Sequence, residues 1–438
     1  MVLPGIIYIM NTLLKILLPI ACLATGAAQA QDIFEGPPIN YSEAAPENPV
    51  ERLRADLASG DITLTPEDRG YLRPLLKLLG IPESSQVLVF SKTSLQINNI
   101  SPAAPRAIYF NDDVYIGSVQ HSDVVEISAA DPKLGTVFYT LSPGAGSGPE
   151  IVRQRHECLQ CHGGSMTHNL PGHIVRSVFP GQDGQPIMKA GSALTDHTTP
   201  MEERWGGWYI TGTHGNARHR GNQIATETQF DAIIDVEAGA NQPTLPPRVN
   251  TADYLTPHSD IVAMLVLEHQ AQMHNLLTRA SFETRMALHR QAVMDKIFDR
   301  APETLSESSQ RIIKSAGDAL VDYMIFAHEE ELESPIQGTS GFAEAFAAQG
   351  PRDSHGRSLR ELDLETRLFE YPLSYLIYSP QFDGLPDAMK DYVYQRLWNI
   401  LTGVEATPDL LFLTNAKCRA IREILIDTKP GLPAYWVR

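Results

Sequence analysis

The sequence predicts an α+β protein in which a β-rich part, residues 66–250, packs on an α-helical part, residues 251–438. Two observations give this order. Short runs of β-branched and aromatic residues, separated by turn residues, fill the stretch from Gln86 to about Ile233. After the proline-rich segment 243–247 the apolar residues change to helical spacing. A chain of 438 residues is long enough for two domains or one large composite fold.

The first 30 residues have the order of a secretory signal peptide. Lys15 precedes the apolar run 16–24, and small residues then lead to an A-x-A cleavage site at Ala30. We therefore expect export to the periplasm, with cleavage near Ala30. A membrane anchor is the alternative, but the apolar stretch is short for one and is broken by Pro19 and Gly26.

The chain is strongly acidic, with 52 acidic and 35 basic side chains and a net charge of −17. Removal of residues 1–30, whose one charged residue is Lys15, changes the net charge to −18. Such a surface argues against nucleic acids and anionic membranes as partners, and suits a basic redox protein or plain solubility. No later segment is apolar for long enough to predict a membrane span after signal cleavage.

Elements follow in order along the chain. Residues 31–65 are rich in Pro, Glu, Asp and Asn and predict a flexible, exposed leader with one short helix at about 50–58. Thr65-Pro66 begins a helix over 71–79, which Gly80 ends. The predicted strands are 87–90, 107–110, 114–117, 124–127, 136–141, 173–179 and 208–213.

Helical patterns are predicted in both parts. Residues 150–161 are expected to be a helix that stops at Gly163-Gly164. In the second part, 338–357 is expected to be a long loop. The helices predicted there are 259–300, 304–332, 358–378, 386–402 and 415–427.

The sequence Cys158-Leu159-Gln160-Cys161-His162 carries the strongest chemical signal. Two thiols three positions apart can each form a thioether to one vinyl group of a porphyrin. The histidine that follows is then placed to be the proximal iron ligand. Together with the export signal, the motif predicts one covalently attached haem c. Cys418 has no disulfide partner in that case and is expected to be a buried structural thiol.

Two other interpretations of the motif stay open. A thioredoxin-like Cys-x-x-Cys would need a surrounding βαβ pattern, which the sequence does not show, and no following histidine. A zinc half-site would need a second pair of ligands, which His214 and His219 are placed to supply. A small class I cytochrome c fold is not expected, because more than 120 residues of the mature chain precede the motif.

The distal iron ligand decides between electron carrier and catalyst, because a filled sixth position favours electron transfer and an open one permits ligand chemistry. His269 and Met273 lie on one apolar helical stripe and face the interior together, with a hydrogen-bonded core histidine as the alternative. The glycine-rich stretch 205–215 offers His214, followed by His219; a twisted strand with an aromatic core pair is the alternative there.

His197 and Arg204 are the catalytic candidates. Over an open iron they could act as acid–base group and charge stabiliser in peroxide cleavage. A structural loop is the alternative.

The chain resembles a family of exported bacterial proteins with a single haem-c motif, described as cytochrome c-like or uncharacterised. The resembling stretches together span most of residues 85–436. The resemblance implies haem, export and one unit for the whole mature chain, but no established reaction. Those stretches are 105–115, 158–178, 195–222, 371–378 and 428–433.

The sequence therefore predicts a periplasmic monohaem c-type cytochrome that exchanges electrons with a protein partner. A haem-dependent oxidoreductase of peroxidase or oxidase type, with an open distal site, is the first alternative, since a bare carrier does not need about 400 residues. A haem-based gas sensor or interaction module is the second.

Overall fold

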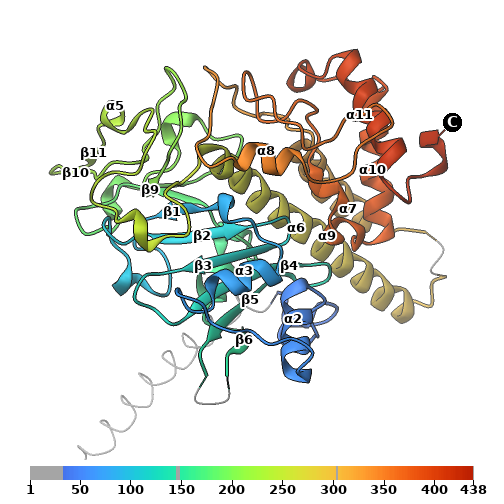
Figure 1. The fold of residues 1–438 in the computed structure, drawn as a ribbon. Coiled ribbons are helices and arrows are strands. Elements are labelled where there is room, and N and C mark those ends of the chain that lie inside the picture. The colour runs from blue at the N-terminus through green and yellow to red at the C-terminus, as the bar shows by residue number, and fades with distance from the viewer. Residues whose placement is uncertain (1–32, 145–147, 302–303, 438) are drawn as a thin grey trace, which may run out of the picture.

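The computed structural model describes residues 33–144, 148–301 and 304–437. Its β-rich part is built on a seven-stranded antiparallel sheet in the order β6-β5-β4-β3-β2-β1-β9. Strands β2 to β6 form a meander, and β9 returns from further along the chain to pair with β1 (Figure 1). The strands are β1 (Val87–Val89), β2 (Arg106–Phe110), β3 (Val114–Ser118), β4 (Val125–Asp131), β5 (Gly135–Ser142), β6 (Glu150–Gln154) and β9 (Trp208–Tyr209).

Two small two-stranded sheets complete the β structure. They pair β7 (Arg176–Val178) with β8 (Ser192–Leu194), and β10 (Thr226–Glu227) with β11 (Ala232–Ile233). The strands predicted between residues 87 and 141 are confirmed, and the two later ones are present but shorter than expected.

One face of the sheet is covered by the N-terminal segment. Helices α2 (Pro49–Ser59) and α3 (Leu72–Leu78) pack their apolar residues against alternate side chains of β2 to β5. Residues 31–65 were expected to be an exposed leader, but Phe34, Ile39 and Tyr41 are buried in this core. The correction has a physical reason: three large apolar side chains outweigh the polar composition around them.

The other face is covered by the long helix α6 (Ile261–Ile297), which lies between the sheet and the C-terminal helices (Figure 1). The predicted helix 259–300 is thus confirmed. Its core is continuous with that of β1, β2 and β9, so the two predicted parts share buried apolar contacts. The other C-terminal helices are α7 (Glu307–Met324), α8 (Phe342–Ala347), α9 (Pro380–Asp383), α10 (Asp387–Leu401) and α11 (Asn415–Thr428).

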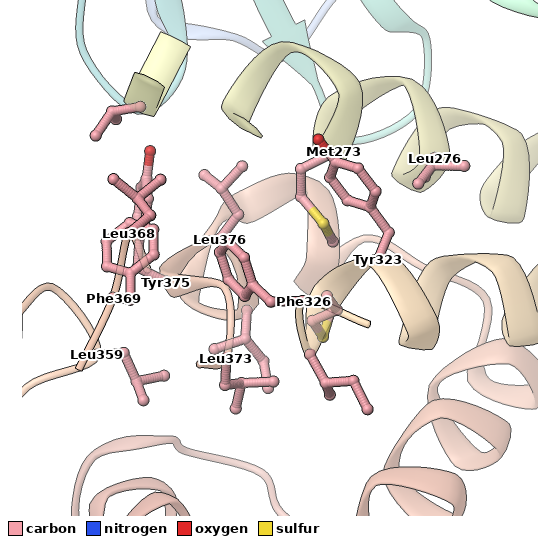
Figure 2. Packing of buried hydrophobic residues seen from close by; sticks show 14 of the residues in the cluster. Met273, Leu276, Tyr323, Phe326, Leu359, Leu368, Phe369, Leu373, Tyr375 and Leu376 are labelled. Carbon is pink, nitrogen blue, oxygen red and sulfur yellow. The ribbon is translucent and has the colours of Figure 1, made fainter. Parts of the chain in front are cut away.

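The shared core continues beneath α6 into the segment 359–376, as Figure 2 shows. A helix was expected over 358–378, but only the 3-10 turn Tyr375–Tyr378 forms there. Asp363 accepts the backbone N–H groups of Glu365 and Thr366, and this turn folds Phe369 back to pair with Leu362. The apolar residues of the segment therefore reach the core because the chain bends back on itself, and not because it forms a helix.

The segment 150–161 was also expected to be a helix that stops at Gly163-Gly164. This prediction is wrong for the first part of the segment, whereas the turn Leu159–His162 is helical and ends at Gly163. Residues Glu150–Gln154 form strand β6 on the free edge of β5, with Ile151 buried and Val152 exposed. These five residues form backbone hydrogen bonds with the edge of β5, which would otherwise be unpaired. Local helical spacing in the sequence does not reveal this pairing. The loop 338–357 also differs, because it contains α8. The short helix α5 (Val236–Gly239) precedes α6.

Among the described residues, no helix is long and apolar enough to cross a membrane.

The N-terminus of α6 depends on the buried Asp260. Its carboxylate accepts the N–H groups of Val262 and Ala263 and three further hydrogen bonds from Thr339 and Ser340. We expect Asp260→Ala to lower the free energy of unfolding by about 2–3 kcal/mol, since it removes both a helix cap and charge-assisted hydrogen bonds. Chemical denaturation measures this.

The control is Asp235→Ala, which removes the exposed cap of the four-residue helix α5. Its cost should stay below about 1 kcal/mol. Equal losses in the two variants would contradict the role given to Asp260.

Candidate haem-attachment site

The cysteine–histidine motif forms a single helical turn directly after β6. Helix α4 (Leu159–His162) begins at Cys158, whose carbonyl accepts the N–H groups of Cys161 and His162 at 3.3 and 2.9 Å. The buried Leu159 anchors the turn. Residues three apart lie on one side of a helix, so the two thiols share a side. Cys158 is half-buried, Cys161 is exposed, and neither is in a disulfide.

The ring of His162 is held in one orientation. Its Nδ1–H donates to the carbonyl oxygen of Gly172 at 2.9 Å, and the ring packs on Phe138 with 4.9 Å between centroids. A carbonyl oxygen only accepts, so Nδ1 carries the proton and Nε2 carries the lone pair. Within the described residues, no hydrogen bond uses Nε2. Burial lowers the pKa of His162, which favours the neutral imidazole that binds metals.

A partly buried ion pair lies close to the motif. The guanidinium of Arg106 is 2.5 Å from the carboxylate of Glu126, and both charges act on Cys158 and His162. Gly117 leaves the space that this guanidinium occupies, because a Cβ atom there would overlap it. The Nε of Arg106 is buried without a hydrogen-bond partner. This N–H is therefore an unused donor beside the ion pair.

The thiols do not have the properties of a thioredoxin-like pair. Burial, helped by Glu126, raises the pKa of Cys158 to about 12, so this thiol stays protonated. Redox-active Cys-x-x-Cys motifs depend on a lowered thiol pKa. The sheet beside the motif is also entirely antiparallel, unlike a βαβ unit. The chemistry of the site thus argues against thiol–disulfide exchange.

The zinc interpretation gains no support. In the parts of the chain that the structure describes, no group of three or more His, Cys, Asp or Glu side chains is arranged to hold a metal ion. Both ring nitrogens of His214 are engaged, by the Ala217 carbonyl and by the N–H of Asn241, each at 2.9 Å. His219 accepts the N–H of Gly221 and packs against His214 and Trp205. Trp205 is a core residue, in agreement with the alternative interpretation of this stretch as a strand with an aromatic core pair.

His269 and Met273 both face the interior, as the helical stripe predicts, and each is fully buried. However, the two ring nitrogens of His269 are engaged by Nδ1 of His197 at 2.9 Å and by the hydroxyl of Ser374 at 2.8 Å. Figure 2 shows Met273 in the apolar core, beside Tyr323. Among the hydrogen bonds and ring contacts of the described residues, none joins His162 to these groups.

His197 and Arg204 come together, but with His269 rather than with His162. Arg204 donates to the carbonyl oxygen of His197 at 3.1 Å and lies 3.4 Å from the carboxylate of Glu268. All four side chains are almost fully buried. Burial lowers the pKa of both histidines and raises that of Glu268 to about 7, although Arg204 opposes the latter. The cluster is a packed polar core.

Two groups of the site were missed by sequence reasoning. Gly172 supplies the acceptor for His162, and Phe138 supplies the surface on which its ring lies. For Gly172, which lies ten residues after His162, the one local indication in the sequence was the dipeptide Pro171-Gly172, which is typical of a turn. Phe138 was predicted only as a strand residue, since strand pairing decides which side chains meet the motif.

The residues present fit a covalently bound haem. The two thiols are unpaired, a lone-pair nitrogen is oriented by a fixed hydrogen bond, and Arg106 has a buried donor to spare. Carbonyl-bound imidazole is the usual arrangement of a metal-ligating histidine, because the outer partner fixes the tautomer and raises the basicity of the ligand.

Comparisons with known proteins give no relative. No protein-family model matches the chain, and neither a curated protein nor a solved structure does. The family resemblance noted for the sequence therefore stays a prediction.

The buried histidine pair predicts a pH dependence of stability. The pKa of His269 is about 3 in the folded protein, against about 6.5 for an exposed imidazole. The unfolded state then binds a proton that the folded state does not, so stability falls as the pH drops below about 6.5. His269→Gln should remove about 1.4 kcal/mol of the loss measured between pH 7.5 and 5.5.

Denaturant titrations at the two pH values measure this difference. The change in unfolding free energy between the two pH values is compared within each protein, so the comparison does not depend on how far the substitution lowers stability at pH 7.5. An identical loss on acidification in variant and parent would show that His269 is not protonated on unfolding.

Proposed function

We propose that the protein is a periplasmic monohaem c-type cytochrome that exchanges electrons with a protein partner. One observation carries the proposal: His162 follows two unpaired thiols on one helical turn, and its Nδ1–H is committed to Gly172, which leaves Nε2 for iron. When bound, the haem supplies one-electron chemistry between ferric and ferrous iron.

The cysteines and the histidine of the motif would hold the haem in different ways. Each of Cys158 and Cys161 adds its S–H across one vinyl double bond, so that a C–S bond forms, the proton ends on the neighbouring carbon, and nothing is oxidised. His162 provides the proximal ligand. The spare donor of Arg106 suits a propionate, whose charge would otherwise face the nearby Glu126.

Electron exchange with a protein partner is supported by the position of the motif at the surface. Gln160 and Cys161 are exposed, as are residues 155–157 before them. An attached group would thus have one edge close to solvent, where transfer distances to a docked protein are short. The net charge of −17 suits a basic partner. The periplasmic location rests on residues 1–30, which lie outside the described residues.

A haem-dependent oxidoreductase with an open distal site is the second candidate. One observation favours it: His269 and His214, two of the predicted distal ligands, have both ring nitrogens engaged by other groups, and Met273 lies in the apolar core. His219, the remaining candidate, uses Nδ1 for the N–H of Gly221, and its buried Nε2 has no hydrogen-bond partner among the described residues. Such an enzyme would need an access route to the iron. The surface cavity of about 370 Å³ that Arg204 lines is not joined to His162 by any contact of the described residues.

Covalent attachment is tested by single thiol variants, produced in a host that matures c-type cytochromes. We expect Cys158→Ser and Cys161→Ser each to lose most haem staining on a denaturing gel, because both thioethers hold the group. Cys418→Ser is the matched control and should stain like the parent protein, since this half-buried thiol lies in α11 and donates weakly to the carbonyl of Leu413, just before that helix. A parent protein that does not stain would refute the proposal.

The distal position is tested by optical spectra of the reduced protein with and without carbon monoxide. The proposed electron carrier predicts a low-spin spectrum that carbon monoxide leaves unchanged, because a side chain then fills the sixth position. Carbon monoxide that binds and shifts the spectrum would instead favour the oxidoreductase or a gas sensor.

A further inference from the structure

The carbonyl that orients His162 belongs to a segment that α6 holds from its far side. Asn275 accepts the N–H of His173 at 2.8 Å through Oδ1, and donates to the carbonyl of the same residue at 2.9 Å through Nδ2. Asn275 is 6% exposed and His173 8% exposed. The amide thus fixes both peptide groups that flank His173, one of which contains the carbonyl of Gly172.

Close packing of Gly172 against Asn275 limits which residue fits at position 172. A Cβ atom on Gly172 would lie 2.4 Å from Oδ1 of Asn275 and 3.1 Å from Cβ of Thr167. A contact of 2.4 Å does not occur without a shift of the neighbouring atoms, so glycine is the residue that lets the segment approach α6 this closely. The N–H of Gly172 also donates to the carbonyl of His162 at 2.9 Å. Gly172 and His162 are therefore joined by two hydrogen bonds, one to the ring and one to the backbone.

The sheet holds the same segment from the opposite side. The ring nitrogens of His173 meet the hydroxyls of Ser128 at 3.0 Å and Thr136 at 3.3 Å, and the ring packs on Tyr115 at 4.1 Å between centroids. The N–H of Thr136 donates to the carbonyl of Pro171. With the sheet on one side and Asn275 on the other, residues 171–173 have little freedom to move.

From this geometry we infer that Asn275 is a positioning residue for the iron ligand His162. It acts through the Gly172–His173 peptide and touches neither the thiols nor the ring. The inference rests on the proposed function, because it matters chemically only if His162 binds iron. Loss of Asn275 frees the Gly172 carbonyl to turn away, so Nδ1–H loses its acceptor and the imidazole becomes a weaker donor.

The reduction potential of Asn275→Ala tests the inference. Outer partners of metal-bound histidines change metal affinity by about 10–100-fold. A weaker donor stabilises ferric iron less, so we expect the potential to become more positive by at least about 59 mV, which is one tenfold change in a one-electron equilibrium. Haem staining should be unchanged, since attachment depends on the cysteines. A potential that stays within about 20 mV of the parent value, about a twofold change, would overturn the inference.

The matched control is Gln381→Ala. Gln381 is also buried and bonds to His274 and Thr278 on α6. It makes no hydrogen bond to residues 167–173, although the ring of its partner His274 lies 5.9 Å from that of His173 between centroids. It should cost similar stability and leave the potential unchanged. If Asn275→Ala fails to fold, Asn275→Leu decides instead, because leucine fills a similar space but makes neither hydrogen bond to His173; a shift to more positive potential supports the inference and no shift overturns it. A parent protein without haem would refute the proposed function, which is a different outcome from haem with an unmoved potential.

Discussion

The hydrogen bond from Nδ1 of His162 to the carbonyl of Gly172 decides which ring nitrogen is available to a metal. Without it, a half-buried histidine beside two cysteines could take either tautomer and several orientations. With it, Nε2 has its lone pair free, and the ring packs on Phe138 in a tilted arrangement. The chemical meaning of the motif depends on this one contact, because the cysteines can hold a porphyrin but cannot orient an axial ligand.

Two parts of the fold, the sheet and helix α6, hold this hydrogen bond in place from opposite sides. The sheet supplies Phe138 and the hydroxyls that hold His173, and α6 supplies the amide that holds the same segment from behind. Helix α6 in turn is fixed at its start by Asp260, which ties it to residues 339–340 of the C-terminal part. A local motif of five residues is thus supported by elements more than a hundred residues away, which gives a physical reason for the size of the protein.

Much of the fold could be predicted from the sequence. Strands with alternating burial and a 37-residue helix carry their periodicity in the residues themselves. Strand 150–154 and the bent segment 358–378 could not be predicted, because strand-edge pairing and a side-chain-capped turn override their local helical spacing. The buried placement of Phe34, Ile39 and Tyr41 likewise depends on a sheet face formed by distant residues. The motif itself was evident, whereas Gly172 and Phe138 were not, since tertiary contacts alone bring them to His162.

The central claim is that Cys158 and Cys161 are both bonded to one haem. Intact-mass measurement of the protein, after denaturation and treatment with a thiol-alkylating reagent, tests this most directly. The account predicts the mass of the processed chain plus one haem, with a single alkylated thiol on Cys418. A haem-free mass with both motif thiols alkylated would contradict it.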